Sequence, residues 1–354
     1  MSALRVFGIT TIGLFALIGV MGVIKKKKTD RTPVAVTMIQ EESLSSSPVI
    51  EEPLTYPVII EKPVYKQPEV QVATVKMTEV VEDVAVPVVD RVNRLFVTGK
   101  GKLPFVETVT YKARVPWLQG RPAWVTDYAS YYNTSRHFIA RSLNGSRDYY
   151  TQKVSSGDSF NVFEKGKDLR FYLIVDLSKL NMHVYAYDAD LNIRYFLKSY
   201  RVGCGKIDKN AASGCLTTLG SYTLGDKVAI YKPGVEGFFK DQKMEMIQVF
   251  GTRWMPYTGE QDETAAMIRG YGIHGVPWII DETTGALIED KAAIGCYNSS
   301  GCIRLLQEDI EELFSIVITK PTTVQIIKNF QEAKLPGVEW VDDIATSTTE
   351  VQKS

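Results

Sequence analysis

The chain has 354 residues, with 41 basic and 41 acidic side chains, three histidines and four cysteines. A net charge of zero argues against a nucleic-acid partner, and four scattered cysteines are too few for a disulfide scaffold or a paired CxxC zinc site. Three histidines make a histidine-built metal centre improbable, so we expect neither a metal nor a cofactor. The length allows about two domains with linkers.

A run of 19 uncharged and mostly apolar residues, 6–24, lies between Arg5 and four lysines at 25–28. This length spans a bilayer, whereas a cleaved signal peptide usually has a shorter apolar core and a small-x-small exit. We therefore predict an N-terminal transmembrane helix within a membrane anchor at residues 1–28. The positive-inside rule places the lysine flank in the cytoplasm. This conflicts with the function expected below, which needs the rest of the chain on the periplasmic or extracytoplasmic side.

Residues 29–90 are rich in Val, Pro, Glu, Thr and Ser, and their only aromatic residues are Tyr56 and Tyr65. Such a composition cannot bury a core, and the evenly spread prolines would interrupt strands formed by the Val/Glu alternation. A flexible chain of this length spans about 40 to 50 Å. We predict a tether.

The composition becomes globular and aromatic over residues 91–165, which we predict to be a small α+β module. Thr126 or Asp127 could cap a helix ending at 132, and Thr134 or Ser135 could cap a second helix ending at 143. A strand is expected near 159–163.

A strand-rich pattern fills residues 166–330, the predicted main domain. Alternating and β-branched runs predict strands at 171–175, 183–187, 193–202, 228–231, 247–250 and 323–327. Residues 307–317 have apolar side chains at i, i+3, i+4 and i+7, which predicts an amphipathic helix. Residues 331–354 are assigned to a polar tail, disordered from about 341.

The chemistry-bearing segment lies between 270 and 305. Cys302 follows Gly301, where a turn can present the sulfur beside converging backbone N–H groups that form an oxyanion hole. Only the thiolate is a good nucleophile, so a base or a cation must lie close to it. His274 and Arg304 are available. A Cys and a His 28 residues apart would alone be weak grounds, because buried structural thiols and histidines are common.

The residues around this pair are more specific. Ile-His274-Gly275, followed by Ser299-Ser300-Gly301-Cys302-Ile-Arg304-Leu, resembles the catalytic motif of L,D-transpeptidases of the YkuD family. The resemblance implies that His274 is the base and Cys302 the nucleophile. It also gives Ser299, Ser300, Gly301 and Arg304 oxyanion or positioning roles.

The resemblance covers about residues 169–328. Residues 171–187 look like the opening β-hairpin of the family, 200–206 like its Val-Gly/Ser-x-Gly-Lys turn, and 216–222 like its Thr-Pro-x-Gly-x-Tyr/Phe element. Residues 250–257 contain the Met-Pro-Tyr segment. The family therefore implies that Met255, Tyr257 and Gly275 lie on the substrate side. The implied fold is mostly β with short helices, a sandwich-like catalytic domain.

Three features depart from the family pattern. Ser300 stands where the family usually has His, so a single histidine remains in the site. The spacing from His274 to Ser300 is long, and we expect residues 276–293 to form an enlarged lid. Thr218 stands where proline is common.

The other cysteines and histidines have structural interpretations. Cys204 and Cys215 flank a short loop and could form a disulfide in an oxidising compartment. Cys296 is expected to be an inert thiol rather than a resolving partner. His137 and His183 stand among aromatic residues and are expected to be structural.

Residues 128–144 and 154–163 look like the helix-helix-strand half of a LysM module, which binds N-acetylglucosamine polymers such as peptidoglycan glycan. The first strand and its glycine turn are not in the usual place. The alternative is a packing domain that braces the catalytic one.

The resemblance implies a peptidoglycan L,D-transpeptidase. Its partners would be stem peptides, glycan strands if the module binds them, and the membrane through the anchor. Cys302 would form a thioester with release of D-Ala, and an acceptor amine would complete a 3→3 cross-link. Four alternatives remain open: an L,D-carboxypeptidase, a protein-anchoring transpeptidase, an inactive peptidoglycan-binding scaffold, and a cytoplasmic thiol hydrolase.

Overall fold

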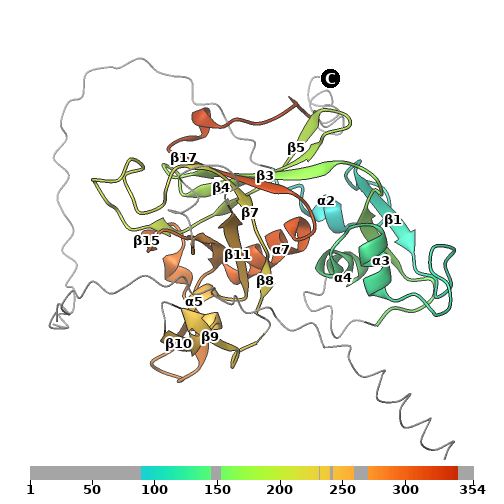
Figure 1. Cartoon of the computed structure of the whole chain (residues 1–354), viewed down its shortest axis with the longest axis horizontal. Helices are drawn as coiled ribbons and strands as arrows, with labels where there is room; N and C mark the ends of the chain where they lie inside the picture. The colour runs from blue at the N-terminus through green and yellow to red at the C-terminus, as the bar shows by residue number, and fades with distance from the viewer. Residues whose placement is uncertain (1–88, 145–152, 231, 240–241, 259–269, 342–354) are drawn as a thin grey trace, which may run out of the picture. The chain divides into compact units, whose positions relative to one another are not determined.

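The computed structural model describes residues 89–144, 153–230, 232–239, 242–258 and 270–341 (Figure 1). The predicted anchor and nearly all of the predicted tether lie outside these residues. Within the described part of the chain, no helix is long and apolar enough to cross a bilayer.

The first folded segment has the order helix, strand, helix, helix, strand. Its elements are α2 (Asn93–Phe96), β1 (Val106–Thr110), α3 (Val125–Tyr131), α4 (Arg136–Asn144) and β2 (Ser159–Phe163). β1 and β2 pair antiparallel, with Val106 opposite Phe163. Both predicted helices and the predicted strand are confirmed, and β1 supplies a strand that the sequence pattern did not reveal.

The helix caps follow from short polar side chains. Ser135 Oγ accepts the Phe138 N–H at 2.9 Å, so it caps α4 as one of the two predicted candidates. α3 begins after Trp124, and Asp127 reaches back to accept the Trp124 N–H at 2.7 Å. Asp127 therefore supports the helix start from inside its first turn rather than as the N-cap residue.

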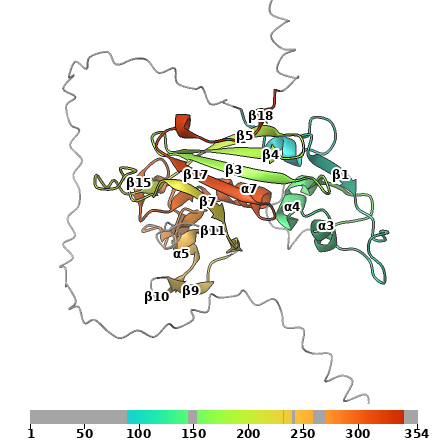
Figure 2. The same cartoon turned by 45° about the horizontal axis from the view of Figure 1, so that its top comes forward.

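A ten-stranded sheet dominates the rest of the described chain. Its strands run in the order β16-β12-β11-β7-β17-β3-β4-β5-β18, with β8 paired to β11. The bounds are β3 (Leu169–Asp176), β4 (Asn181–Asp188), β5 (Ile193–Arg201), β7 (Gly220–Leu224), β8 (Val228–Ala229), β11 (Arg253–Thr258), β12 (Gly272–Gly275), β16 (Ile303–Leu305), β17 (Thr322–Ile327) and β18 (Val338–Glu339). Figure 2 shows β3, β4 and β5 side by side. The predicted mostly β fold is confirmed.

Smaller pairs surround this sheet. β9 (Glu236–Phe239) pairs with β10 (Gln242–Glu245), β13 (Trp278–Ile280) with β14 (Leu287–Glu289), and β15 (Tyr297–Ser299) with β6 (Cys204–Gly205). The β13–β14 hairpin and a 3-10 turn, η1 (Lys291–Ala293), occupy the predicted lid segment.

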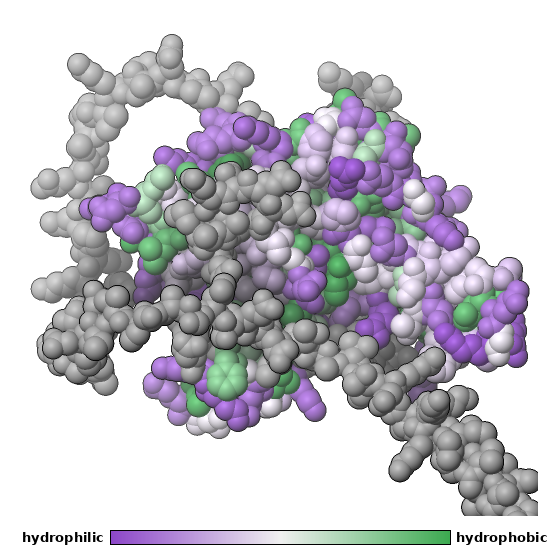
Figure 3. All heavy atoms as spheres, in the orientation of Figure 1, coloured by the Kyte–Doolittle hydropathy of each residue, from purple (hydrophilic) through white to green (hydrophobic). Residues whose placement is uncertain are grey.

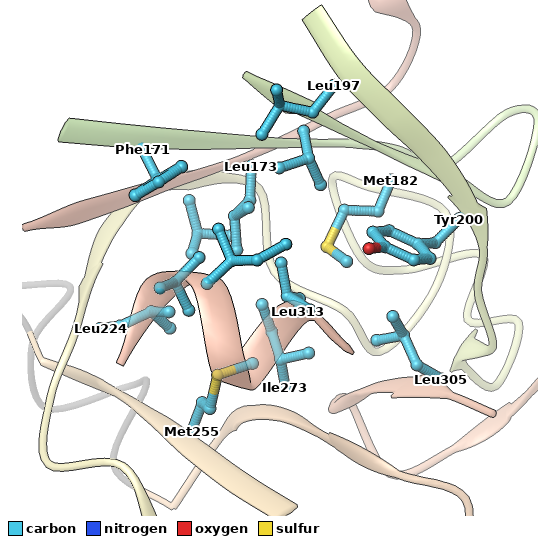
Figure 4. Packing of buried hydrophobic residues seen from close by; sticks show 14 of the residues in the cluster. Phe171, Leu173, Met182, Leu197, Tyr200, Leu224, Met255, Ile273, Leu305 and Leu313 are labelled. Atoms are coloured by element: carbon cyan, nitrogen blue, oxygen red, sulfur yellow. The ribbon is translucent and has the colours of Figure 1, made fainter. Parts of the chain in front are cut away.

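The main core lies between the sheet and α7 (Gln307–Val317), whose predicted bounds are confirmed. On β3, Phe171, Leu173 and Val175 join this core, whereas Ile174 joins a separate cluster. Strand side chains alternate between the two faces, so both faces of β3 are covered. Leu313 of α7 points toward the strand residues in Figure 4. Hydrophilic residues dominate the coloured surface in Figure 3, as expected if the apolar residues fill the core.

Two sequence expectations differ from the structure. Residues 247–250, predicted as a strand, form the one-turn helix α5 (Ile247–Phe250), which ends at Gly251 with φ 60°. A four-residue segment with three apolar residues fits either period, and the positive φ at glycine ends the segment as a helical turn. The predicted strand at 228–231 is shortened to β8.

The segment after β17 also differs. Residues 331–340, assigned to the polar tail, continue through η2 (Phe330–Glu332) and return to the sheet as β18 beside β5. Trp340 packs on Tyr195, with ring centroids 5.3 Å apart. The buried edge of β5 and this aromatic contact order a segment whose composition is polar.

The first segment packs on α7 rather than standing apart. Ser135 Oγ donates to the Ser315 carbonyl at 2.6 Å, and the His137 ring meets Phe314 edge-on at 5.2 Å. Phe138 and Phe163 belong to the same hydrophobic cluster as the sheet residues. These contacts hold the first segment against α7. The LysM resemblance stays a prediction.

All three histidines are buried, and this burial affects the stability of the fold. Burial lowers the pKa of His137 to about 3, and it also lowers the pKa of His183. An unfolded histidine titrates near 6.5. Between pH 6.5 and the folded pKa, the unfolded chain binds more protons, so acidification below 6.5 favours unfolding.

We therefore expect the free energy of unfolding to fall as the pH is lowered from 6.5 to 4. His137→Gln should make this slope shallower, by up to about 1.4 kcal/mol per pH unit for one proton. Denaturant titrations at a series of pH values check the difference. Equal slopes for both proteins would show that His137 is not held neutral.

Candidate active site

Two short parallel strands carry the residues predicted for catalysis. β12 and β16 pair with Ile273 opposite Ile303 and His274 opposite Arg304. Residues in register on parallel strands point to the same face, and alternate residues share a face. Ile273 and Ile303 are buried in the main core. His274 and Arg304 therefore lie on the other face, and alternation puts Cys302, the residue immediately before β16, on that same face.

The His274 ring is buried, with 4% of the residue exposed. Its Nδ1 lies 2.7 Å from the Gly275 carbonyl oxygen. A carbonyl only accepts, so Nδ1 carries the hydrogen and Nε2 carries the lone pair. Burial lowers the pKa of His274 to about 4, and nearby Arg304 acts in the same direction. The imidazole is thus a neutral base at neutral pH.

Two aromatic rings enclose His274. Phe250 meets it edge-on at 5.5 Å, and Trp254, its cross-strand partner on β11, lies 5.8 Å away. These rings exclude water and help keep the imidazole neutral. Neither ring was predicted from the sequence to have a role in the site. Strand alternation was the signal that could have indicated Trp254, because a buried Met255 places its neighbour on the opposite face of the strand, beside His274.

The turn that precedes Cys302 is held by Ser299. Ser299 Oγ accepts the Gly301 N–H at 3.0 Å and donates to the Cys302 carbonyl at 2.7 Å. Ser299 is buried, Ser300 is exposed and Cys302 is partly exposed. Ser299 is thus a positioning residue by geometry, and the Gly301 N–H is already engaged within the turn.

Gly301 cannot be replaced without strain. Its φ is 130°, and an added Cβ would lie 2.6 Å from Cε1 of Tyr271 and 3.0 Å from the Leu216 carbonyl oxygen. The residue before Cys302 therefore has to be glycine for two reasons: its φ is positive, and there is no room for a Cβ.

Arg304 is fixed at one end. Its Nη1 donates to Asn298 Oδ1 at 3.0 Å, and its buried Nε has no hydrogen-bond partner among the described residues. Burial lowers the pKa of Arg304, whereas Cys302 and Asp290 raise it. The guanidinium brings positive charge to the face that carries Cys302, and its bond to Asn298 also holds the loop.

The three residues predicted on the substrate side are all buried. Met255 is fully buried opposite Ile273, because strand alternation turns it into the core. Tyr257 is buried and stacked on Tyr222 at 5.0 Å, and burial raises its pKa. Gly275 faces α7, where an added Cβ would lie 3.3 Å from Ile310 Cγ2.

The remaining cysteines lie outside the catalytic pair. Cys204 and Cys215 are buried thiols, and Cys296 is exposed. Burial raises the pKa of Cys204. None of these cysteines is in a disulfide in the structure, and the described residues contain no group of side chains that could hold a metal ion.

A neutral buried base predicts an unusual pH profile. We expect the rate of Cys302 acylation to keep its value down to pH values well below 6.5, with an acid limb near 4. Trp254→Ala admits water to the imidazole and should move this limb upward. Rate measurements by intact mass across pH 3.5–8 check both. A limb at 6.5 in the unmodified protein would contradict the assignment.

Gly301→Ala should slow Cys302 acylation by roughly 100-fold, because the turn must shift to relieve the Tyr271 contact. Gly99→Ala is the matched control, since Gly99 has φ 108° but nothing within 4 Å of an added Cβ. Stopped-flow or mass-spectrometric acylation rates separate the two. Similar rates for both variants would show that the contact is unimportant.

Comparisons with known proteins give one family match and several similar solved structures. Residues 170–326 match the family model of the L,D-transpeptidase catalytic domain, YkuD. Similar solved structures include the helical cell shape determining protein Pgp2 from Campylobacter jejuni, with 17% identity, a TM-score of 0.30, and coverage of 48% of this chain and 50% of that one. Another is Bd1075 from Bdellovibrio bacteriovorus, with 14% identity, a TM-score of 0.29, and coverage of 52% and 56%.

The chain thus spans about half the length of the solved structures that it matches. No curated protein matches it. The family match encloses His274 and Cys302 as well as every strand of the main sheet except β18, apart from the outermost residues of β3 and β17. Residues 170–326 therefore belong to the YkuD family of L,D-transpeptidase catalytic domains.

Proposed function

We propose that this protein is a peptidoglycan L,D-transpeptidase that forms 3→3 cross-links through a thioester on Cys302. The observation that carries the proposal is the placement of a neutral His274 and Cys302 on one face of two paired strands. The family match supports the reaction class. The substrate and the acceptor are part of the proposal.

In the first half-reaction, Nε2 of His274 takes the thiol proton of Cys302. The thiolate attacks the carbonyl carbon between the third residue of a tetrapeptide stem and its terminal D-Ala. The tetrahedral intermediate then collapses and the C–N bond breaks. The leaving amine of D-Ala takes the proton from His274, so the site is left with a thioester and a neutral imidazole.

In the second half-reaction, the side-chain amine of a diamino acid on a neighbouring stem attacks the thioester. His274 accepts the amine proton and returns it to the departing sulfur. A new amide bond forms and the Cys302 thiol is restored. Buried aromatic rings around His274 limit competition from water.

The site requires access to the cell wall, so we propose a periplasmic or extracytoplasmic location with the predicted N-terminal anchor in the membrane. The four lysines after the anchor argue for the opposite orientation. A topology reporter fused to the C-terminus distinguishes the two, and a cytoplasmic result would favour a thiol hydrolase.

The decisive experiment incubates the full chain with tetrapeptide-stem muropeptides and analyses the products by mass spectrometry. We expect D-Ala release and a 3→3 dimer with the unmodified protein, and loss of both with Cys302→Ala. Cys296→Ala is the matched control, because it removes an exposed thiol six residues away and should leave the products unchanged.

Other results select the alternatives. D-Ala release without a dimer indicates an L,D-carboxypeptidase or an acceptor that is a protein amine. No reaction, together with retained binding to intact peptidoglycan, indicates a wall-binding scaffold. The first segment is where such binding would be sought, because it presents the exposed indole of Trp124 beneath the Arg121 guanidinium, 5.3 Å away.

A further inference from the structure

Thr217 connects the nucleophile turn to the loop that follows β6. The residue is completely buried, and its Oγ1 makes two hydrogen bonds. It accepts the Gly205 N–H at 2.8 Å and donates to the Gly301 carbonyl oxygen at 3.0 Å. A hydroxyl has only one hydrogen, and Thr217 donates it to the Gly301 carbonyl. The Gly205 N–H therefore donates to a lone pair of Thr217 Oγ1. The two bonds together fix the hydroxyl in one orientation.

The loop is built to bring this hydroxyl close. An added Cβ at Gly205 would lie 2.6 Å from the Thr217 backbone nitrogen, so only glycine permits this approach. The Leu216 N–H donates to the Lys206 carbonyl at 2.8 Å, which closes the two sides of the loop on each other. Thr217 is therefore held on both its backbone and its side chain.

The bond to Gly301 determines where the next N–H points. The Gly301–Cys302 peptide is trans and planar, so its C=O and N–H point in opposite directions. Thr217 holds the Gly301 oxygen in the buried interior. The Cys302 N–H therefore points away from Thr217. The Gly301 N–H is engaged by Ser299 Oγ, so it cannot serve the same purpose in this arrangement.

We propose that Thr217 is the positioning residue of the oxyanion hole, acting through the Gly301–Cys302 peptide to aim the Cys302 N–H at the developing oxyanion. The inference rests on the proposed acyl transfer at Cys302. Thr217 touches neither the substrate nor the sulfur. Its effect is confined to steps in which a carbonyl becomes tetrahedral, because only these develop charge on an oxygen.

Two thiol reactions separate this role from a structural one. Acylation of Cys302 by p-nitrophenyl acetate passes through a tetrahedral oxyanion, whereas alkylation by iodoacetamide is a direct displacement that does not. In the full chain, Thr217→Val should slow acylation of Cys302 by about 10- to 100-fold. Its alkylation rate should change less than twofold. Thr217→Ser keeps the hydroxyl and should restore acylation.

The chain supplies its own controls. Peptide mapping by mass spectrometry measures Cys302 and the exposed Cys296 in one sample, and the rates at Cys296 should be the same in all variants. Thr322→Val removes another buried threonine hydroxyl, which donates to the carbonyl of Lys320 two residues earlier in the chain, and should leave both rates unchanged. Thr217→Ala, measured alongside, loses the same two bonds without adding a methyl group.

Equal slowing of acylation and alkylation in Thr217→Val and Thr217→Ala would overturn the proposal, because it would mean that the whole turn is displaced. Unchanged acylation in either folded variant would also overturn it. These outcomes differ from a failure of the proposed function. In that case the protein would not process muropeptides, but acylation of Cys302 by p-nitrophenyl acetate would still report on the Cys302 N–H.

Discussion

The pairing of β12 with β16 is the constraint on which the site depends. Each strand is short, and their register places His274 opposite Arg304 and turns Ile273 and Ile303 into the core. A slip of one residue would move one partner of the proposed catalytic pair to the buried face. Neighbouring backbone prevents it. Gly203 and Arg304 exchange two hydrogen bonds of 2.9 Å, and an added Cβ at Gly203 would meet the Ala293 carbonyl oxygen at 2.2 Å. Because residue 203 is glycine, its backbone can approach closely enough to bond to Arg304, and these bonds hold β16 in register with β12.

Burial differs between the two residues of the proposed catalytic pair. His274 is enclosed by Phe250 and Trp254, and its pKa falls to about 4. Such a base is weak but is always unprotonated near neutral pH, and its tautomer is set by the Gly275 carbonyl. Cys302 is partly exposed at the end of a turn, where a substrate can reach it. The orientation of His274 therefore comes from the backbone of its own strand.

The sequence predicted the parts of this arrangement that depend on local patterns. The motif around His274 and Cys302, the α7 bounds and the β2 bounds follow from periodicity, spacing and resemblance. The failures have a common physical cause, which is tertiary context. Residues 247–250 form a helix because Gly251 adopts a positive φ, and residues 331–340 are ordered by the edge of β5. Met255 was predicted on the substrate side from its motif. Strand alternation buries Met255 in the core and turns its neighbour Trp254 toward His274.

The two ends of the described chain meet at one place. Arg91 and Arg94 lie over the Trp340 ring, at 5.5 and 5.1 Å from its centroid, and the Arg91 N–H donates to the Leu197 carbonyl of β5 at 2.7 Å. β18 and β16 stand at opposite ends of the strand order. A pull on the chain at residue 89 is therefore borne first by α2, β5 and β18. The mechanical load enters the sheet at the edge farthest in strand order from the nucleophile, so tension along the leading segment can be carried without distorting the β12–β16 register.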